Sequence, residues 1–126
     1  MINNIGKITL YFENQEDAKN FWVKKLNFVV KLEQEMGPGM KWIEVAPSKE
    51  SLTTFILYDK NMMKVQNPAV NVEHPSILLS TNDIDKAYID MKNNSVEVGE
   101  LMNMPYGKMF SFKDLENNDY LLREDK

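Results

Sequence analysis

Two segments of the chain, about 70 residues apart, show the same succession of hydrophobic and polar positions. In the first, hydrophobic and polar residues alternate over residues 7–12, which predicts a half-buried strand. Asn14 then offers a helix N-cap, and apolar residues recur at helical spacing over residues 18–26. Asn27 is predicted to end this helix, because asparagine tolerates the left-handed conformation.

The second segment repeats this strand and helix. Ile77 and Leu79 stand where the first strand has apolar residues, and Asp83 stands in the place of the N-cap. The second helix is predicted to end near Asn93-Asn94. Both segments are therefore expected to form a strand followed by an amphipathic helix that covers it.

Strand-like segments and turns follow each helix. They cover residues 28–35, 41–46 and 53–58 after the first helix, and 96–102, 107–113 and 119–124 after the second. Residues 60–75 contain Asn67-Pro68 and no sustained period, which is typical of a loop. The sequence thus predicts one domain made of two βαβββ modules, over about residues 5–59 and 76–124, joined by a linker over about residues 60–75.

Composition and charge limit the classes of function. The 126 residues are enough for one domain with a buried core. The 15 basic and 19 acidic side chains are mixed along the chain, so we expect no nucleic-acid partner. Cysteine is absent, which excludes disulfides, thiolate nucleophiles and cysteine-bound zinc. No apolar stretch approaches the ~20 residues that span a bilayer, and the N-terminus lacks a signal-peptide pattern, so we expect a cytoplasmic protein with no membrane partner.

Motifs near both ends of the chain suggest a family. The stretch ITLYFENQEDAKNFWVKKLNF (8–28) is similar to an opening strand and helix that end in a Leu-Gly-Phe corner, with Asn27 in place of the glycine. The stretch DLENNDYLLRE (114–124) is similar to an Asp-Pro-Asp-Gly-Asn turn and final strand, with Leu115 and Asn117 in place of the proline and the turn glycine. Asparagine is the next-best residue for a positive φ. With the repeat, these motifs resemble the vicinal oxygen chelate superfamily, also called the glyoxalase/bleomycin-resistance/dioxygenase family.

The resemblance implies an α+β fold in which the paired modules form a cup-shaped, partly closed mixed sheet. This is the glyoxalase/bleomycin resistance/dihydroxybiphenyl dioxygenase fold, with helices outside and a ligand inside the cup. Ile8, Leu10 and Phe12 would then pack under the first helix. Strand alternation turns the following residues toward the cup: Lys7, Thr9, Tyr11, Ser76, Leu78 and Ser80. The resemblance also implies a homodimer, with modules paired either within one chain or between chains.

Metal-dependent members of the family hold a divalent ion with His, Gln or Glu side chains from four strands. The positions that match here are Lys7, Leu57, Ser76 and Leu121. Two are aliphatic, one is a cation and one is a weak neutral oxygen, so we expect neither a metal nor another cofactor. His74, the one histidine of the sequence, precedes Pro75, which weakens a strand there. We therefore expect His74 to be a loop residue.

The remaining candidates are side chains that can line a pocket. Residues 101–110 are dense in methionine and aromatic side chains, which either adapt to an irregular ligand or simply fill a core. Trp42 can stack on a planar ligand, and Lys7 can pair with an acidic or carbonyl group. Tyr106, at a turn, can close over a ligand. The predicted ligand-binding residues are Lys7, Thr9, Tyr11, Trp42, Leu57, Ser76, Leu78, Met102, Tyr106, Met109 and Leu121.

These residues favour a metal-free protein that binds a small, partly planar molecule without chemistry. It resembles family members that sequester antibiotics, and an aromatic metabolite fits equally well. This hypothesis predicts no catalytic residues. A second hypothesis is a glyoxalase-like lyase or a dioxygenase-like enzyme with a non-standard site, using groups such as Lys7 and Tyr106. A third is a dimeric interaction module with a vestigial pocket. All three stay open, because a fold does not fix a function.

Overall fold

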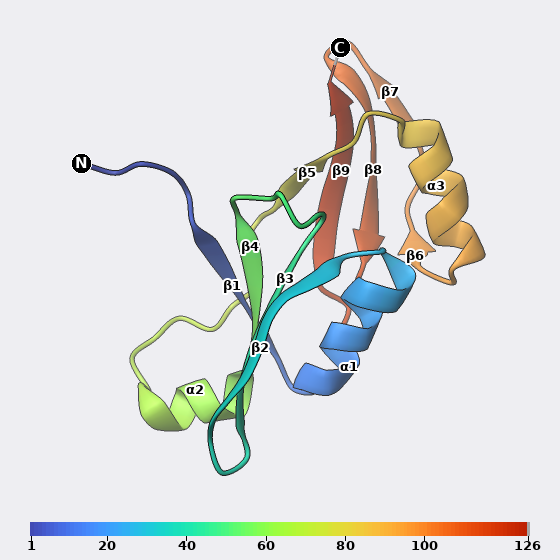
Figure 1. Cartoon of the computed structure of the whole chain (residues 1–126). Helices are drawn as coiled ribbons and strands as arrows, with labels where there is room; N and C mark the ends of the chain where they lie inside the picture. Colours follow the sequence, from blue (N-terminus) through green and yellow to red (C-terminus); the bar gives the residue numbers. More distant parts are fainter. Residues whose placement is uncertain (126) are drawn as a thin grey trace. The chain divides into compact units, whose positions relative to one another are not determined.

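The computed structural model describes residues 1–125 as an α+β protein whose described part divides into two compact units (Figure 1). The first unit covers Met1–His74 and the second begins at Pro75. Each unit contains a β-sheet with both parallel and antiparallel pairs, and a helix packs against that sheet. The α+β class that the family resemblance implied is confirmed.

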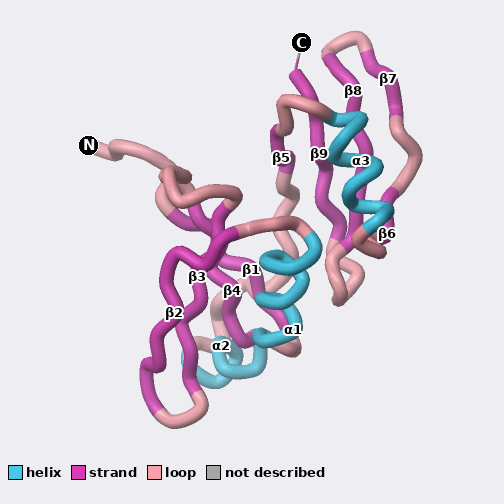
Figure 2. Tube along the Cα trace, turned by 45° about the vertical axis from the view of Figure 1, so that its right-hand side comes forward, coloured by secondary structure: helices cyan, strands magenta, loops and turns pink. Residues whose placement is uncertain are grey.

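The sheet of the first unit has the strand order β1-β4-β3-β2. Its strands are β1 (Lys7–Phe12), β2 (Val29–Gly37), β3 (Met40–Ala46) and β4 (Thr54–Asp59). β1 and β4 run parallel, whereas the other neighbours run antiparallel. The helical elements are α1 (Gln15–Asn20), the π-helical turn η1 (Phe21–Lys25) that continues it, and α2 (Lys60–Gln66) (Figure 2).

The helix boundaries of the first unit follow from local chemistry. The Asn14 side chain accepts a hydrogen bond from the backbone N–H of Asp17 at 3.0 Å, which confirms the predicted N-cap of α1. Asn27, with a φ of 58°, lies just after the helical segment, as predicted. Asp59 caps α2 in the same way, through the N–H of Met62 at 3.0 Å. The segment predicted to be a loop therefore begins with a helix.

The sheet of the second unit has the order β5-β9-β8-β6, and β7 also pairs with β8. Its elements are β5 (Leu78–Ser80), α3 (Ile84–Asn93), β6 (Glu97–Val98), β7 (Met102–Met104), β8 (Gly107–Lys113) and β9 (Asp119–Asp125). Asp83 caps α3 through the N–H of Lys86 at 3.1 Å, as predicted. The strand predicted over 96–102 is interrupted after Val98, and it continues as the short strand β7.

A buried carboxylate organises the turn between β8 and β9. Asp114 accepts hydrogen bonds from the backbone N–H groups of Glu116 and Asn118, and from the Tyr120 hydroxyl at 2.7 Å. Asn117 has a φ of 64°, so asparagine does replace glycine at the left-handed position. Burial and the nearby Asp114 charge raise the pKa of Tyr120, so its hydroxyl stays protonated and donates to Asp114.

Each unit has its own apolar core between helix and sheet. In the first, the Trp22 ring lies 4.9 Å from Phe28 and 5.2 Å from Phe55, while Leu10 and Phe12 are fully buried. In the second, Tyr88 of α3 packs edge-to-face on Phe110 of β8 at 4.9 Å. We call the opposite face of each sheet, away from α1 or α3, its open face.

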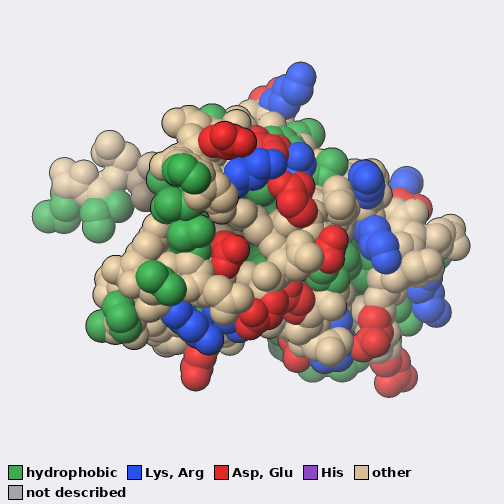
Figure 3. Space-filling view, turned by 90° about the horizontal axis from the view of Figure 1, so that it is seen from below, with side chains coloured by type: hydrophobic (Ala, Val, Ile, Leu, Met, Phe, Trp, Pro, Cys, Tyr) green, Lys and Arg blue, Asp and Glu red, His purple; other side chains and the backbone are tan. Residues whose placement is uncertain are grey.

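The surface carries both signs of charge. On the side of the molecule shown in Figure 3, Lys and Arg side chains are interspersed with Asp and Glu side chains. Within residues 1–125, none of the helices has the length and apolar composition needed to cross a bilayer.

Candidate functional site

Strand alternation places several predicted residues on the open face of the first unit. Lys7, Thr9 and Tyr11 alternate with the buried residues of β1. Trp42 of β3 lies on the same face, because its ring meets that of Tyr58, which is the register partner of Tyr11. The structure therefore brings Lys7, Thr9, Tyr11 and Trp42 together on one sheet face.

Lys7 is ion-paired on this face. Its ammonium Nζ lies 2.9 Å from Oε1 of Glu44, a carboxylate whose residue is only 5% exposed. The Glu44 side chain also accepts hydrogen bonds from Trp42 Nε1 at 2.7 Å and from Thr54 Oγ1 at 3.0 Å. Burial alone would raise the pKa of Glu44, but the hydrogen bonds from Trp42, Lys7 and Thr54 outweigh it and hold the pKa below its usual value. Glu44 is therefore a buried anion at neutral pH.

Aromatic rings continue this face beside the ion pair. Trp42 and Tyr58 meet edge-to-face, with centroids 6.2 Å apart, and Tyr58 meets Tyr11 at 6.1 Å. The Tyr58 hydroxyl donates a hydrogen bond to the side-chain carbonyl of Gln66 in α2. All three rings are partly exposed. The open face of the first unit thus combines a half-exposed ammonium with a row of aromatic rings.

The predicted placement of Leu57 is wrong. The parallel register pairs Leu57 with Leu10, and register partners in a parallel ladder point to the same face. Leu57 is accordingly fully buried on the helix side of the sheet. The open-face residues of β4 are Thr54, Ile56 and Tyr58. Matching the family motif one residue out of register on β4 reverses the face of the side chain, because the strand period is two.

The open face of the second unit has a hollow of about 510 Å³ over β5, β8 and β9. It is lined by Ser76, Ile77, Leu78, Ser111, Asp119, Tyr120 and Leu121. Leu78 and Leu121 are register partners, and they are 51% and 37% exposed. The structure therefore brings the predicted residues Ser76, Leu78 and Leu121 together in one depression with a largely apolar floor.

The other predicted residues of this unit form a group beside the hollow. Met102 is the register partner of Met109, which is in turn the partner of Arg123. The Tyr106 hydroxyl lies 3.9 Å from the Met109 sulfur, and the Arg123 guanidinium lies over the Tyr106 ring at 5.2 Å. Contact of these residues with a ligand stays a prediction.

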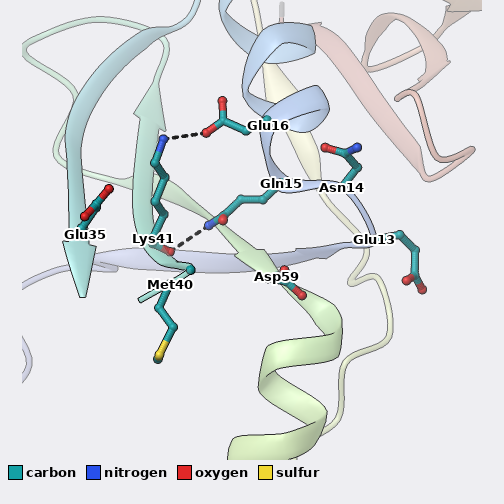
Figure 4. A pocket seen from close by; sticks show the side chains of 9 residues that line it. Glu13, Asn14, Gln15, Glu16, Glu35, Met40, Lys41 and Asp59 are labelled. Atoms are coloured by element: carbon teal, nitrogen blue, oxygen red, sulfur yellow. Dashed lines mark hydrogen bonds and ion pairs between the residues drawn. The ribbon is translucent and has the colours of Figure 1, made fainter. Parts of the chain in front are cut away.

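A second hollow, of about 420 Å³, lies at the end of the first unit's sheet where β3 and β4 meet α1 (Figure 4). Lys41 and Gln15, which line it, have structural partners. Lys41 bonds Glu16 at 2.8 Å and Glu33 at 3.1 Å, and Gln15 donates to the Lys41 carbonyl at 2.9 Å. The hydrogen bonds to Glu16 and Glu33 raise the pKa of Lys41 to about 12. We interpret these groups as polar contacts that hold α1 against the β2–β3 hairpin.

Metal ligands do not gather in the part of the chain that the structure describes. Among residues 1–125, no group of three or more His, Asp and Glu side chains has a geometry suited to a metal ion. Correcting the β4 register by one residue replaces Leu57 at the family's ligand position with Ile56 or Tyr58. Neither is a His, Gln or Glu.

Comparison with known proteins identifies the family. The model of the Glyoxalase/Bleomycin resistance protein/Dioxygenase superfamily matches residues 4–120. The chain belongs to this superfamily. A relative in Bacillus subtilis strain 168, the uncharacterized protein YetH, is 39% identical over 125 residues, covering 98% of this chain and 100% of that protein.

Solved structures of the superfamily confirm the fold that the resemblance implied. TnmS3, an antibiotic binding protein from Streptomyces sp. CB03234, is similar at a TM-score of 0.82 and 26% identity, covering 99% of this chain and 98% of that chain. A superfamily member from Sphaerobacter thermophilus DSM 20745 is similar at a TM-score of 0.82 and 25% identity, covering 98% of both chains.

Two residues of the open face were missed from the sequence. Glu44 lies two positions after Trp42 in KWIEVA, so strand alternation does put both on one face. The charge between the apolar residues Ile43 and Val45 was the available signal for the unusual position of Glu44, although it does not indicate the role of this residue. Tyr58 was missed because the shifted match on β4 assigned the ligand face to Leu57 instead.

Proposed function

We propose that this superfamily member binds and sequesters a small, partly planar molecule on the open face of a unit, without chemical conversion and without a metal. One observation carries the proposal: Leu78 and Leu121 are large apolar side chains, side by side on neighbouring strands, and both are exposed in a hollow. Exposed apolar groups that line a depression are typical of a ligand site, and about 500 Å³ suits a small organic molecule.

Two further observations support this function. TnmS3, which is similar over nearly the whole chain, is an antibiotic binding protein. The family's ligand positions in this chain hold Lys7, Ser76, Leu121 and either Ile56 or Tyr58 of β4, which are poor ligands for a divalent ion. We also infer that the protein is a homodimer, as the family resemblance implies. Light scattering coupled to size-exclusion chromatography measures the molar mass and tests this directly.

A ligand screen tests the proposal. Planar antibiotics and aromatic metabolites are tested for thermal stabilisation of the full chain, and each hit is titrated by calorimetry. Leu121→Gln, which places an amide in the hollow, is expected to weaken binding at least about tenfold, because burying an unpaired amide is costly. Leu115→Gln is the matched control, since Leu115 is 40% exposed in the β8–β9 turn and does not line the hollow.

The bound compound is then recovered and identified by mass spectrometry. We expect the compound to be chemically unchanged after prolonged incubation with the protein. We also expect the affinity to be unchanged after the protein has been treated with a chelator. A converted product would replace the proposal with the enzyme hypothesis. A stoichiometric metal in the purified protein that stabilises the fold would refute the metal-independent part. Equal affinities for Leu121→Gln and Leu115→Gln would remove the hollow from the site.

A further inference from the structure

The open face of the first unit indicates which class of ligand the protein takes. We propose that Glu44 is a positioning residue that orients the Trp42 ring and the Lys7 ammonium toward a planar aromatic ligand with a carboxylate or phenolate at its edge. This inference rests on the proposed function, because it names the ligand of the same binding protein.

The Trp42 ring is held by its polar edge. Its Nε1–H donates to Glu44 Oε2 at 2.7 Å, and a hydrogen bond to a charged acceptor is stronger than one to a neutral group. Tyr58 meets the ring at an interplanar angle of 89°, and its own hydroxyl is fixed to Gln66 of α2. Both rings are thus held at their polar edges while they remain partly exposed. A held ring loses little rotational freedom when a planar molecule packs on it.

The ammonium of Lys7 is the charge that this face offers to solvent. The Lys7 side chain is 50% exposed, whereas the Glu44 side chain is 7% exposed. The two Glu44 oxygens already accept hydrogen bonds from Lys7, Trp42 and Thr54. An ammonium has three N–H donors, so Lys7 can bind Glu44 and an oxyanion together. A cationic ligand would meet Lys7 first, and the carboxylate that would attract it is buried.

Three probes that differ in charge test the ligand class. They are 2-naphthoate, 2-naphthamide and 2-naphthylmethylammonium, which share one planar ring system. Binding to the full chain is followed residue by residue from backbone amide NMR signals. We expect 2-naphthoate to bind at least about tenfold more tightly than the other two, with shifts in β1, β3 and β4.

Lys7→Met tests the charge. It keeps the length of the side chain and removes the ammonium, so 2-naphthoate is expected to lose its advantage and bind as 2-naphthamide does. Lys86→Met is the matched control, because Lys86 lies on α3 and pairs there with Asp90 at 2.6 Å. The control is expected to keep the full preference for 2-naphthoate.

Glu44 is tested through the Trp42 indole. In protein with ¹⁵N-labelled tryptophan, Trp42→Phe assigns the indole signal of Trp42 against that of Trp22. The Trp42 indole proton is expected to exchange slowly with solvent in the unsubstituted protein and rapidly in Glu44→Leu. The binding of each probe is expected to weaken in Glu44→Leu as well. Glu44→Gln keeps an acceptor oxygen and is expected to restore slow exchange and most of the 2-naphthamide affinity. Where Glu44→Leu does not fold, Glu44→Gln and Lys7→Met still decide the outcome.

The results separate this inference from the function on which it rests. Probe shifts confined to the hollow of the second unit, or a preference for 2-naphthoate that survives Lys7→Met, would overturn the inference and leave small-molecule binding intact. Rapid exchange of the Trp42 indole in the unsubstituted protein would overturn the positioning role of Glu44. If neither the probes nor the compounds of the ligand screen bind to either unit, the proposed function fails together with the inference.

Discussion

At the scale of single residues, Glu44 shows how a buried charge is stabilised. Desolvation disfavours the carboxylate, yet three donors from three strands converge on it: Lys7 of β1, Trp42 of β3 and Thr54 of β4. A buried carboxylate without such partners would take up a proton instead. The donors keep Glu44 ionised, and they also join neighbouring strands on the face where we place the ligand.

The lowered pKa of Glu44 predicts a pH dependence of stability. Its pKa in the folded chain lies below the ordinary 4.5, so between the two values the unfolded chain binds more protons than the folded chain. The stabilisation is therefore complete above about pH 4.5, and it is lost as the pH falls through the folded value. We expect the free energy of unfolding, measured with urea from pH 7 down to about 3, to fall more steeply in the unsubstituted protein than in Glu44→Gln. Parallel curves for the two proteins would contradict this assignment.

Residues whose role depends on neighbouring backbone were predictable from the sequence. Asn14 and Asp83 cap helices, and Asn27 and Asn117 adopt positive φ, because each choice is decided within a few positions along the chain. The prediction for Leu57 was wrong because the face of this side chain depends on the register with β1, which lies far away in sequence. The role of Glu44 needed three donors that lie up to 37 positions away, so no local pattern could indicate it.

At the scale of elements, the repeat predicted those strands and helices that bury an apolar side. The same rule explains why α2 was missed: each of its residues is at least partly exposed, so it leaves no apolar stripe in the sequence. The π-helical turn η1 was missed for another reason. Its buried residues Phe21 and Trp22 satisfy an α-helical spacing as well, and the spacing does not distinguish the two helix types.

Because α2 lacks a buried side, its N-cap is expected to be important for its stability. Asp59→Ala removes the acceptor of the Met62 N–H and is expected to destabilise the helix by about 1 kcal/mol. Hydrogen exchange should show faster exchange at Asn67, whose N–H bonds the Met63 carbonyl. The control is Asp90→Ala, which removes an exposed i,i+4 pair with Lys86 and should destabilise the protein less than Asp59→Ala does. Unchanged exchange at Asn67 in Asp59→Ala would show that tertiary contacts rather than the cap hold α2.

At the scale of the whole molecule, the class and the family were predictable from the sequence, because the repeat and the motifs near both ends together resemble one family. The location of the hollow in the second unit was only partly predictable. The sequence predicted Ser76, Leu78 and Leu121 on the ligand side. Ser111 also lines the hollow because of the β8–β9 register, which could not be predicted from the sequence. The identity of the ligand depends on side-chain geometry rather than on the fold, so it must come from binding experiments.

The proposed sequestration without chemistry has a thermodynamic consequence for the whole chain. A ligand that binds only the folded state raises the free energy of unfolding by about 2.7 kcal/mol when its free concentration is about 100 times Kd. For a chain of this size, we expect the midpoint of thermal unfolding to rise by several degrees and to keep rising with the logarithm of ligand concentration. Leu121→Gln should shift the onset of this rise to at least about tenfold higher concentration, while Leu115→Gln should follow the unsubstituted protein. A rise that stops once ligand and protein are equimolar, with no further logarithmic increase, would contradict reversible binding to the folded state and would instead indicate a covalent product.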